Sequence, residues 1–418
     1  MSAVVVGAGV AGLTAAYRLA CAGEQVTVLE ASDRVGGMVR PVELAGRRVD
    51  AGAEAFARRR QVVDELCAEL GLEVEAPAHR PRIRWSLDRS WTAADGVLGV
   101  PGSPDDRSLW EALPDHDLVV ARVEPYLPPA LGADATTLAE LVDTRLGRGV
   151  TQRLVAPVTR CALGREPDQV LLHEMAPALV GPGSLYAKVT AARGGRSSVA
   201  RPVGGLFRLV EALADRVSEH GGSIRLNQAV TGLQRAGEGW QVEAGEPVVA
   251  DRVVLACPGS PASELLGQVG VEVSPTSRPG SVSVLLAVEA TALGQVPLCS
   301  GVLMGRPVPG LRARALTWHT AKWPTGDDPV AVLRVSYPPG TEPTPDLALA
   351  DASVMLGCEL EEALDAVVTL WPKSPVALAP QAQSELLAAL PPGLHVAGAW
   401  AFGNGVEAAV GSGLAAAS

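Results

Sequence analysis

Residues 3–12 read Ala-Val-Val-Val-Gly7-Ala-Gly9-Val-Ala-Gly12, and this stretch decides the fold. The β-branched run predicts a short buried strand, and residues 10–22 predict a helix directly after the glycines. Residues 25–29 predict a second strand, which ends beside Glu30. A Gly-x-Gly-x-x-Gly turn in this context, with an acidic residue after the next strand, is typical of a dinucleotide-binding βαβ unit.

Each glycine of the turn has a separate task in such a unit. Gly7 permits the tight turn, Gly9 lets the backbone approach a pyrophosphate, and Gly12 lets the helix pack on the strand. The helix N-terminus offers free N–H groups and its positive dipole end to the phosphates. Glu30 is placed to accept hydrogen bonds from ribose hydroxyls. The cofactor-binding residues predicted in this unit are Gly7, Gly9, Val10, Ala11, Gly12, Glu30 and Ala31.

Composition narrows the class of protein further. The 418 residues are 47% hydrophobic and 19% charged, which is typical of a globular chain long enough for two or three domains. A formal net charge of −11 argues against nonspecific nucleic-acid binding. The six cysteines form no CxxC pair, so we expect reduced thiols and no metal site. We expect no secretory signal and no transmembrane segment, and hence a cytoplasmic protein for which peripheral membrane contact stays open.

The residues after Glu30 identify the dinucleotide. They read Asp33-Arg34-Val35-Gly36-Gly37-Met38-Val39-Arg40, and the paired glycines let a loop run close under a larger cofactor. This stretch resembles the E-x-x-x-R-x-G-G loop of the amine oxidase and protoporphyrinogen oxidase superfamily of flavoproteins. The resemblance implies that the cofactor is FAD. It also implies that this loop lies beside the FAD pyrophosphate and flavin, with contacts from Arg34, Gly36, Gly37, Met38 and Val39.

Three later segments resemble further parts of the same FAD site. Near the C-terminus, glycines precede a predicted helix over residues 406–417, whose N-terminus would face the flavin pyrimidine edge. In the middle of the chain, residues 224–230 resemble the strand that reaches the adenine side, where the backbone of Val230 would bond to the adenine ring. Residues 254–259 resemble another strand of the superfamily, with the pattern VVLATP. The residues that these segments and residues 52–53 are expected to contribute are Gly52, Ala53, Val230, Cys257, Gly398, Ala399, Gly405 and Val406.

One segment indicates a branch of the superfamily. Residues 50–60 read Asp-Ala-Gly52-Ala-Glu-Ala-Phe-Ala-Arg-Arg59-Arg60 and resemble a segment of bacterial coproporphyrinogen III and protoporphyrinogen oxidases. The resemblance implies dehydrogenation of coproporphyrinogen III to coproporphyrin III in two-electron steps, with hydride transfer to flavin N5, proton loss from a pyrrole nitrogen, and O₂ as the final acceptor. Because such a substrate is a flat ring edged with carboxylates, Arg59 and Arg60 are the predicted substrate-binding residues. No general base is assigned.

Two segments depart from the family pattern. Residues 160–167 read Arg-Cys-Ala-Leu-Gly-Arg-Glu-Pro where the family has G-[VI]-Y-[AG]-G-D-P. Residues 403–409 read Gly-Asn-Gly-Val-Glu407-Ala-Ala where the family has G-x-G-[IV]-P-D-C. Four alternatives therefore stay open: a protoporphyrinogen IX oxidase, an amine oxidase with Trp400 as its lone aromatic candidate, a tailoring flavoenzyme of secondary metabolism, and a porphyrin-binding paralogue without turnover. Contact with other haem-pathway enzymes also stays open.

The expected fold is α/β, with a discontinuous Rossmann-like FAD domain, a mixed-sheet substrate domain and a helical insert. The FAD domain is expected over residues 1–75, 200–275 and 380–418. The substrate domain is expected over residues 76–106 and 276–379, and the helical insert over residues 107–199.

Overall fold

The structure is a computed structural model that describes residues 1–324, 326 and 328–418. The chain divides into two compact units. The first comprises Met1–Glu75, Val199–Gly280 and Trp371–Ser418, and the second comprises Ala76–Ser198 and Ser281–Leu370. Residues 107–198 fall within the second unit, and their separation as a domain of their own stays a prediction.

A five-stranded parallel sheet organises the first unit. Its order is β12-β2-β1-β16-β22, with bounds Ser223–Arg225, Gln25–Leu29, Ser2–Val6, Arg252–Leu255 and Leu394–Val396. The order places β1 at the centre, flanked by β2 and β16. The expected mixed α/β fold with a discontinuous first unit is confirmed.

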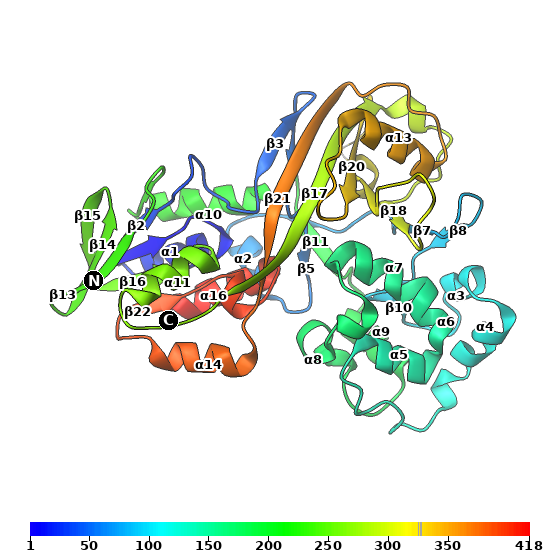
Figure 1. Cartoon of the computed structure of the whole chain (residues 1–418), viewed down its shortest axis with the longest axis horizontal. Helices are drawn as coiled ribbons and strands as arrows, with labels where there is room; N and C mark the ends of the chain where they lie inside the picture. Colours follow the sequence, from blue (N-terminus) through cyan, green and yellow to red (C-terminus); the bar gives the residue numbers. More distant parts are fainter. Residues whose placement is uncertain (325, 327) are drawn as a thin grey trace. The chain divides into compact units, whose positions relative to one another are not determined.

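The two faces of this sheet bury alternate residues of the same strand. Ala3 and Val5 of β1 pack with the core formed by α1, α2, α10 and α16, whose bounds are Val10–Cys21, Val62–Glu69, Phe207–Glu219 and Val406–Ala417. Val4 and Val6 pack on the other face with Trp240 and with α11 (Gly259–Gly267). Burial on both faces explains why the strand is apolar throughout instead of alternating. Helices α1 and α16 lie side by side (Figure 1).

Smaller elements complete the first unit. They are β3 (Pro41–Leu44), β4 (Arg47–Asp50), β5 (Phe56–Ala57), β6 (Val74–Glu75), β11 (Val199–Pro202), β13 (Gly232–Ala236), β14 (Gly239–Ala244), β15 (Glu246–Ala250), α14 (Pro380–Ala389) and α15 (Ala399–Phe402). Strand β13 begins at Gly232, so Val230, a residue expected to contribute to the cofactor site, lies before the strand and its backbone is outside the ladder.

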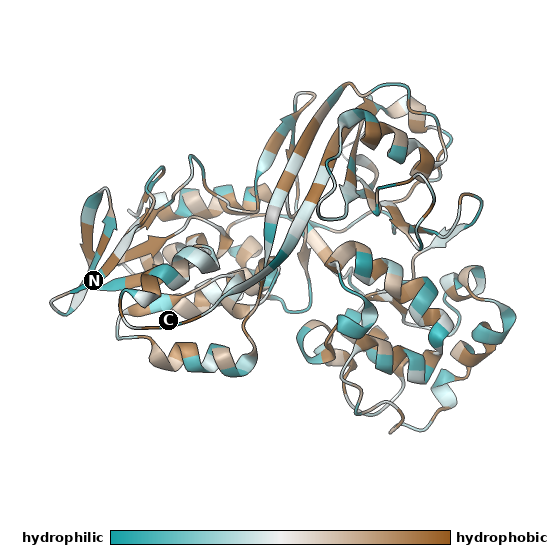
Figure 2. Cartoon of the chain, in the orientation of Figure 1, coloured by the Kyte–Doolittle hydropathy of each residue, from teal (hydrophilic) through white to brown (hydrophobic). Residues whose placement is uncertain are grey.

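A seven-stranded sheet forms one part of the second unit, in the order β21-β17-β20-β19-β18-β7-β8. The bounds are Asp365–Val376, Thr276–Glu289, Val330–Tyr337, Ala315–Trp318, Gly301–Met304, Arg82–Arg84 and Ser90–Thr92, so β17 and β21 have residues in both units. Helix α13 (Pro345–Leu356) packs on a core built with β17, β18 and β20. Figure 2 shows hydrophobic bands along β21, and the exposed fractions alternate there: Val368 and Leu370 are 48% and 63% exposed, whereas Thr369 between them is 2% exposed.

The other part of the second unit is helical, as expected for the insert over residues 107–199. Its helices of four or more residues are α3 (Arg107–Ala112), α4 (Asp115–Arg122), α5 (Leu138–Leu146), α8 (Leu172–Met175) and α9 (Leu185–Arg193), with two π-helical turns, η2 (Thr151–Val155) and η3 (Thr159–Leu163). Short helices α6 (Arg148–Val150) and α7 (Ala156–Val158) precede these turns, and β9 (Gly96–Val97) pairs with β10 (Val100–Pro101). Over the described part of the chain, no helix has the length and hydropathy needed to span a membrane.

Candidate functional site

The glycine turn after β1 is shaped by contacts that only glycine allows. Gly7 has φ +103°, and a Cβ there would lie 3.0 Å from the carbonyl oxygen of Ala256. A Cβ on Gly12 would overlap the carbonyl oxygen of Gly7 and approach the Cβ of Ala256 to 3.1 Å. The two glycines therefore let α1 pack directly against the turn and against the end of β16.

Gly9 differs from its neighbours, because nothing in the protein requires it to be glycine. Its φ is −74°, which any residue adopts, and a Cβ there would meet no atom within 4 Å. Gly9 is also the N-cap of α1, and no side chain caps this helix in the structure. Open space in front of uncapped N–H groups fits a phosphate-bearing ligand, since a helix N-terminus presents donors and positive potential there.

Glu30 holds the turn from the end of β2. Its Oε2 accepts a hydrogen bond from the Ala8 N–H at 2.7 Å, and its Oε1 accepts from the Ser32 N–H and Oγ at 2.9 and 2.7 Å. These three bonds leave the carboxylate about one further acceptor position, because two carboxylate oxygens offer about four lone pairs. That remaining position fits the predicted bond from a ribose hydroxyl.

The predicted flavin loop lies against the glycine turn. The Gly36 N–H donates to the Ala8 carbonyl oxygen at 2.8 Å, and Gly9 and Gly36 form an isolated parallel bridge. A Cβ on Gly37 would lie 3.5 Å from the Cα of Gly9. Because Gly36 and Gly37 have φ values of +111° and +58°, the paired glycines supply backbone angles that other residues rarely adopt.

The segment of residues 51–53 packs beside this loop. The Ala53 N–H donates to the Met38 carbonyl oxygen at 3.4 Å, and a Cβ on Gly52 would overlap the same oxygen. The side chain of Met38 is 47% exposed, whereas Val39 is buried. Arg34 is half exposed and pairs with Asp33 at 3.2 Å.

Two residues from the middle of the chain approach the same region. Cys257 lies two residues after the end of β16, with its backbone nitrogen 3.1 Å from the position of a Cβ on Gly7, and burial raises the pKa of its thiol to about 12. Burial thus favours the neutral thiol, which packs against the core on the face of the sheet that carries Trp240. The Gln228 N–H donates to the Glu30 carbonyl oxygen at 2.8 Å, which brings the chain next to Glu30 two residues before Val230.

Helix α16 brings the C-terminal segment to the turn. A Cβ on Gly413 would overlap the Ala11 carbonyl oxygen and lie 2.9 Å from the Cβ of Thr14, so the two helices cross in direct backbone contact. One residue earlier, the Ser412 Oγ accepts a hydrogen bond from the Gly398 N–H at 3.0 Å. Gly405, with φ +99°, is the N-cap of α16 and lacks a side-chain cap. Ala399 begins α15, and Val406 begins α16 with its side chain buried.

The two predicted substrate-binding arginines lie beside the N-terminus of α16. The Arg59 Nε donates to the Glu407 Oε2 at 3.2 Å, and the Arg60 backbone N–H donates to the other Glu407 oxygen. The Glu407 side chain is only 7% exposed. The guanidinium of Arg59 therefore already has a carboxylate partner within the chain. The side chain of Arg60 is exposed.

Several residues that position this site were not predicted. Ser32 completes the bonding of Glu30, and Ser412 fixes Gly398. The buried carboxylate of Asp50 accepts hydrogen bonds from the Leu206 and Phe207 N–H groups at the start of α10. Only Asp50 carried a signal, because it opens the segment over residues 50–60 that resembles the family.

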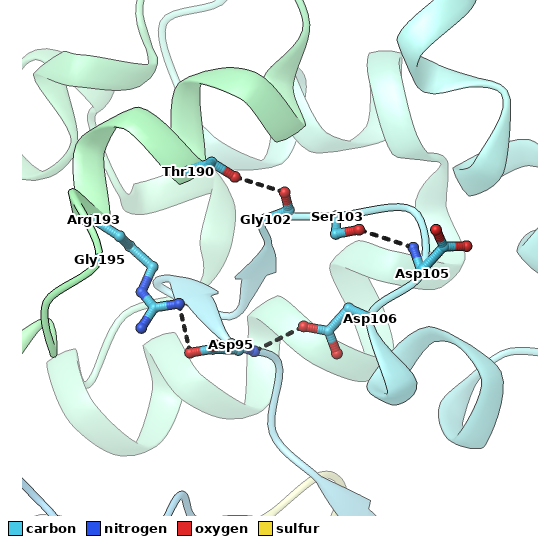
Figure 3. A pocket seen from close by; sticks show the side chains of 8 residues that line it. All are labelled: Asp95, Gly102, Ser103, Asp105, Asp106, Thr190, Arg193 and Gly195. Carbon is cyan, nitrogen blue, oxygen red and sulfur yellow. Dashed lines mark hydrogen bonds and ion pairs between the residues drawn. The ribbon is translucent and has the colours of Figure 1, made fainter.

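A pocket in the second unit has a different character. It has a volume of about 300 Å³, and none of the predicted site residues lines it (Figure 3). Its polar groups bond to one another: Arg193 pairs with Asp95 at 2.7 Å, and the Asp95 N–H donates to Asp106 at 3.0 Å. Asp105 adds a third carboxylate, so the pocket is unsuited to a polyanionic substrate. Among the described residues, no group of histidines, cysteines or carboxylates is arranged to hold a metal ion.

Comparisons with known proteins agree with this geometry. The family described as flavin containing amine oxidoreductase matches residues 10–418. Coproporphyrinogen III oxidase of Mycobacterium tuberculosis is 31% identical over 98% of this chain and 94% of its own length. A protein of the same organism, described provisionally as a flavin-containing monoamine oxidase, is 32% identical over 59% of this chain and 56% of its own length.

A solved structure gives the same result for the fold. The crystal structure of a protein from Exiguobacterium sp. 255-15, described provisionally as a protoporphyrinogen oxidase, matches with a TM-score of 0.80 and 21% identity. The match covers 99% of this chain and 96% of that one. The first unit therefore has the fold of an FAD-binding flavoprotein, and the cofactor prediction is confirmed.

Proposed function

Because the chain belongs to the family of flavin containing amine oxidoreductases, we propose that it is an FAD-dependent oxidase that dehydrogenates coproporphyrinogen III to coproporphyrin III in haem biosynthesis. The observation that carries this proposal is the match to coproporphyrinogen III oxidase along nearly the whole chain. Such a match includes the substrate-binding part of the fold as well as the part that binds FAD. The proposal includes O₂ as the electron acceptor.

Amine oxidation has weaker support. The monoamine oxidase match spans a smaller share of the chain. Trp400, the aromatic residue that an amine oxidase would place beside the flavin, is 2% exposed and packs in the core with Leu394 and Val396. A buried core tryptophan cannot stack on a substrate.

The residues of the first unit would hold the cofactor in a defined way. We assign the FAD pyrophosphate to the N–H groups of the first turn of α1, the ribose to Glu30, and the adenine to the backbone of Val230. The N-terminus of α16 would favour negative charge on the flavin, because its uncapped N–H groups and dipole are positive. When bound, FAD would accept a hydride, that is two electrons and one proton, from the substrate, and the protein positions the substrate and excludes water.

The test is the reaction of the purified holoenzyme with three reduced substrates. The protein is mixed anaerobically with coproporphyrinogen III, protoporphyrinogen IX or a primary amine, and flavin absorbance is followed. We expect flavin bleaching with coproporphyrinogen III, and porphyrin formation above the autoxidation rate once O₂ is admitted. A Gly9→Val variant, which should fold without retaining FAD, is the matched control. Porphyrinogens that stay at their autoxidation rates with the flavin-loaded protein would contradict the proposal.

A further inference from the structure

Arg314 lies in the sheet of the second unit with its backbone fully engaged. Its N–H donates to the Ser336 carbonyl oxygen at 2.9 Å, and its own carbonyl oxygen accepts from the Met304 N–H at 3.0 Å. Arg314 therefore sits directly before β19, between the end of β18 and β20. These bonds fix where the side chain starts, so its guanidinium is carried on a rigid element.

Within the described residues, the guanidinium of Arg314 has no carboxylate partner. Its Nε is buried without a hydrogen-bond partner, and no ion pair joins the side chain to any residue in the described parts of the chain. Burial lowers its pKa. The carboxylate of Asp351, which is 3% exposed, accepts a hydrogen bond from the N–H of Ala313, the residue before Arg314, at 3.0 Å. A partly buried cation without a partner is costly, and an anion supplied from outside the chain would remove that cost.

Neighbouring arginines show that the local fold can pair such groups. The Arg160 Nε lies 2.7 Å from Glu166, and Arg165 NH1 lies 3.7 Å from Glu174. Both belong to residues 160–167, one of the two segments where the chain departs from its family pattern. Arg314 is thus a cation left without a carboxylate in a region where other arginines have one.

The same departing segment lies against Arg314. The Cys161 Sγ donates to the Arg314 carbonyl oxygen at 3.2 Å. Gly164 closes the π-helical turn with φ +62°, and a Cβ there would lie 3.9 Å from Arg314 NH1. Gly164 therefore lies beside the guanidinium, and as a glycine it brings no side-chain carboxylate or other polar group to it.

We propose that Arg314 binds a carboxylate of the substrate, which on the proposed function is a propionate of the porphyrinogen. The planar guanidinium can donate two parallel hydrogen bonds to a carboxylate, and a partly buried site strengthens both. This replaces Arg59 as the leading candidate for substrate recognition, because Glu407 already accepts from the Arg59 guanidinium.

The experiment compares an acid with its ester. Coproporphyrin III and its tetramethyl ester are titrated into FAD-loaded wild type, Arg314→Met, Arg314→Lys and Arg165→Met in one detergent buffer, and binding is followed by porphyrin fluorescence. Arg165→Met is the matched control, because that arginine has a carboxylate partner. FAD content and thermal melting establish that each variant is folded.

We expect Arg314→Met to weaken binding of the acid by a factor on the order of ten to one hundred, as for a hydrogen bond to a charged group. Binding of the ester should stay unchanged, Arg314→Lys should recover part of the loss, and Arg165→Met should resemble wild type. Folded Arg314→Met that binds the acid as wild type does, or that loses acid and ester equally, would overturn the assignment. Failure of the proposed function is distinct, because wild type itself would then bind and oxidise no porphyrinogen.

Discussion

Two glycines in helix α16 should respond differently to substitution by alanine. Gly411 and Gly413 are two residues apart, but a Cβ on Gly411 would meet no atom within 4 Å, whereas a Cβ on Gly413 would overlap the Ala11 carbonyl oxygen. It would also lie 2.9 Å from the Cβ of Thr14, which is about half an ångström or more short of an ordinary carbon–carbon contact. Helix α16 must therefore move away from α1 in Gly413→Ala.

The magnitudes follow from this difference. Gly411→Ala gains helix propensity of about 1 kcal/mol. Gly413→Ala gains the same propensity but carries an overpacking cost of about 1–3 kcal/mol, so its net effect is destabilising or near zero. In a unit of this size, 1 kcal/mol corresponds to roughly 2–4 °C in melting temperature. We expect Gly411→Ala to melt higher than wild type and Gly413→Ala to melt lower than Gly411→Ala by several degrees.

Cofactor affinity gives the second readout. Moving α16 displaces Ser412, which holds the Gly398 N–H, and shifts the N-terminus of the helix. We therefore expect FAD to dissociate more readily from Gly413→Ala, measured by flavin fluorescence on dilution, and to dissociate at the wild-type rate from Gly411→Ala. Equal melting temperatures and equal FAD release in the two variants would refute the inferred helix contact.

Three further predictions concern the glycine turn, a buried ion pair and the loss of stability at acid pH. Gly9→Val should fold, since its φ is −74° and its Cβ would meet no protein atom within 4 Å, but it should be purified without flavin, as its visible spectrum would report. Arg145→Met should cost about 3–5 kcal/mol in denaturant unfolding, because it leaves the fully buried Glu124 without its partner at 2.5 Å; adding Glu124→Gln should recover much of that loss, and additive losses would contradict this. The hydrogen bond from Arg18 lowers the pKa of Glu69 below its ordinary value of 4.5. The ionised carboxylate of Glu69 therefore stabilises the folded state fully above pH 4.5, and this contribution is lost as the pH falls through the pKa of the folded state. The side chains of Arg18 and Glu69 are 33% and 38% exposed, so solvent weakens their interaction. Glu69→Gln should therefore lower the free energy of unfolding by less than about 1 kcal/mol at pH 7. The difference in melting temperature between variant and wild type should vanish at acid pH.

The glycine turn could be predicted from sequence because each of its requirements is local. Gly7, Gly12 and Glu30 lie within one βαβ unit, where spacing alone brings them together. Strands β15 and β21 were not predicted, and both lie at the edge of their sheets. Each contains proline, which removes a backbone donor and is tolerated at an edge, so the pattern that identifies central strands is absent.

The charged residues of the site were harder to predict, because an arginine is available to bind a substrate only if no carboxylate of the chain already pairs with it. Arg59 and Glu407 are 348 positions apart, and no spacing rule connects them. Arg314 belongs to none of the motifs found in the sequence. It became a candidate for substrate binding only because no carboxylate pairs with it among the described residues. Sequence reasoning could predict that cations are needed, but it could not tell which of many arginines are already paired.

The pairing of Arg59 also changes the meaning of the C-terminal departure from the family pattern. Glu407 stands where the family has proline, in the first turn of a helix whose N-terminus is assigned to the flavin. An unpaired carboxylate there would oppose negative charge on the flavin and would support a paralogue that had lost turnover. In the structure, this carboxylate is buried and accepts hydrogen bonds from the Arg59 guanidinium and the Arg60 backbone. Its charge is therefore compensated within the fold, and the departure is compatible with an active flavin site.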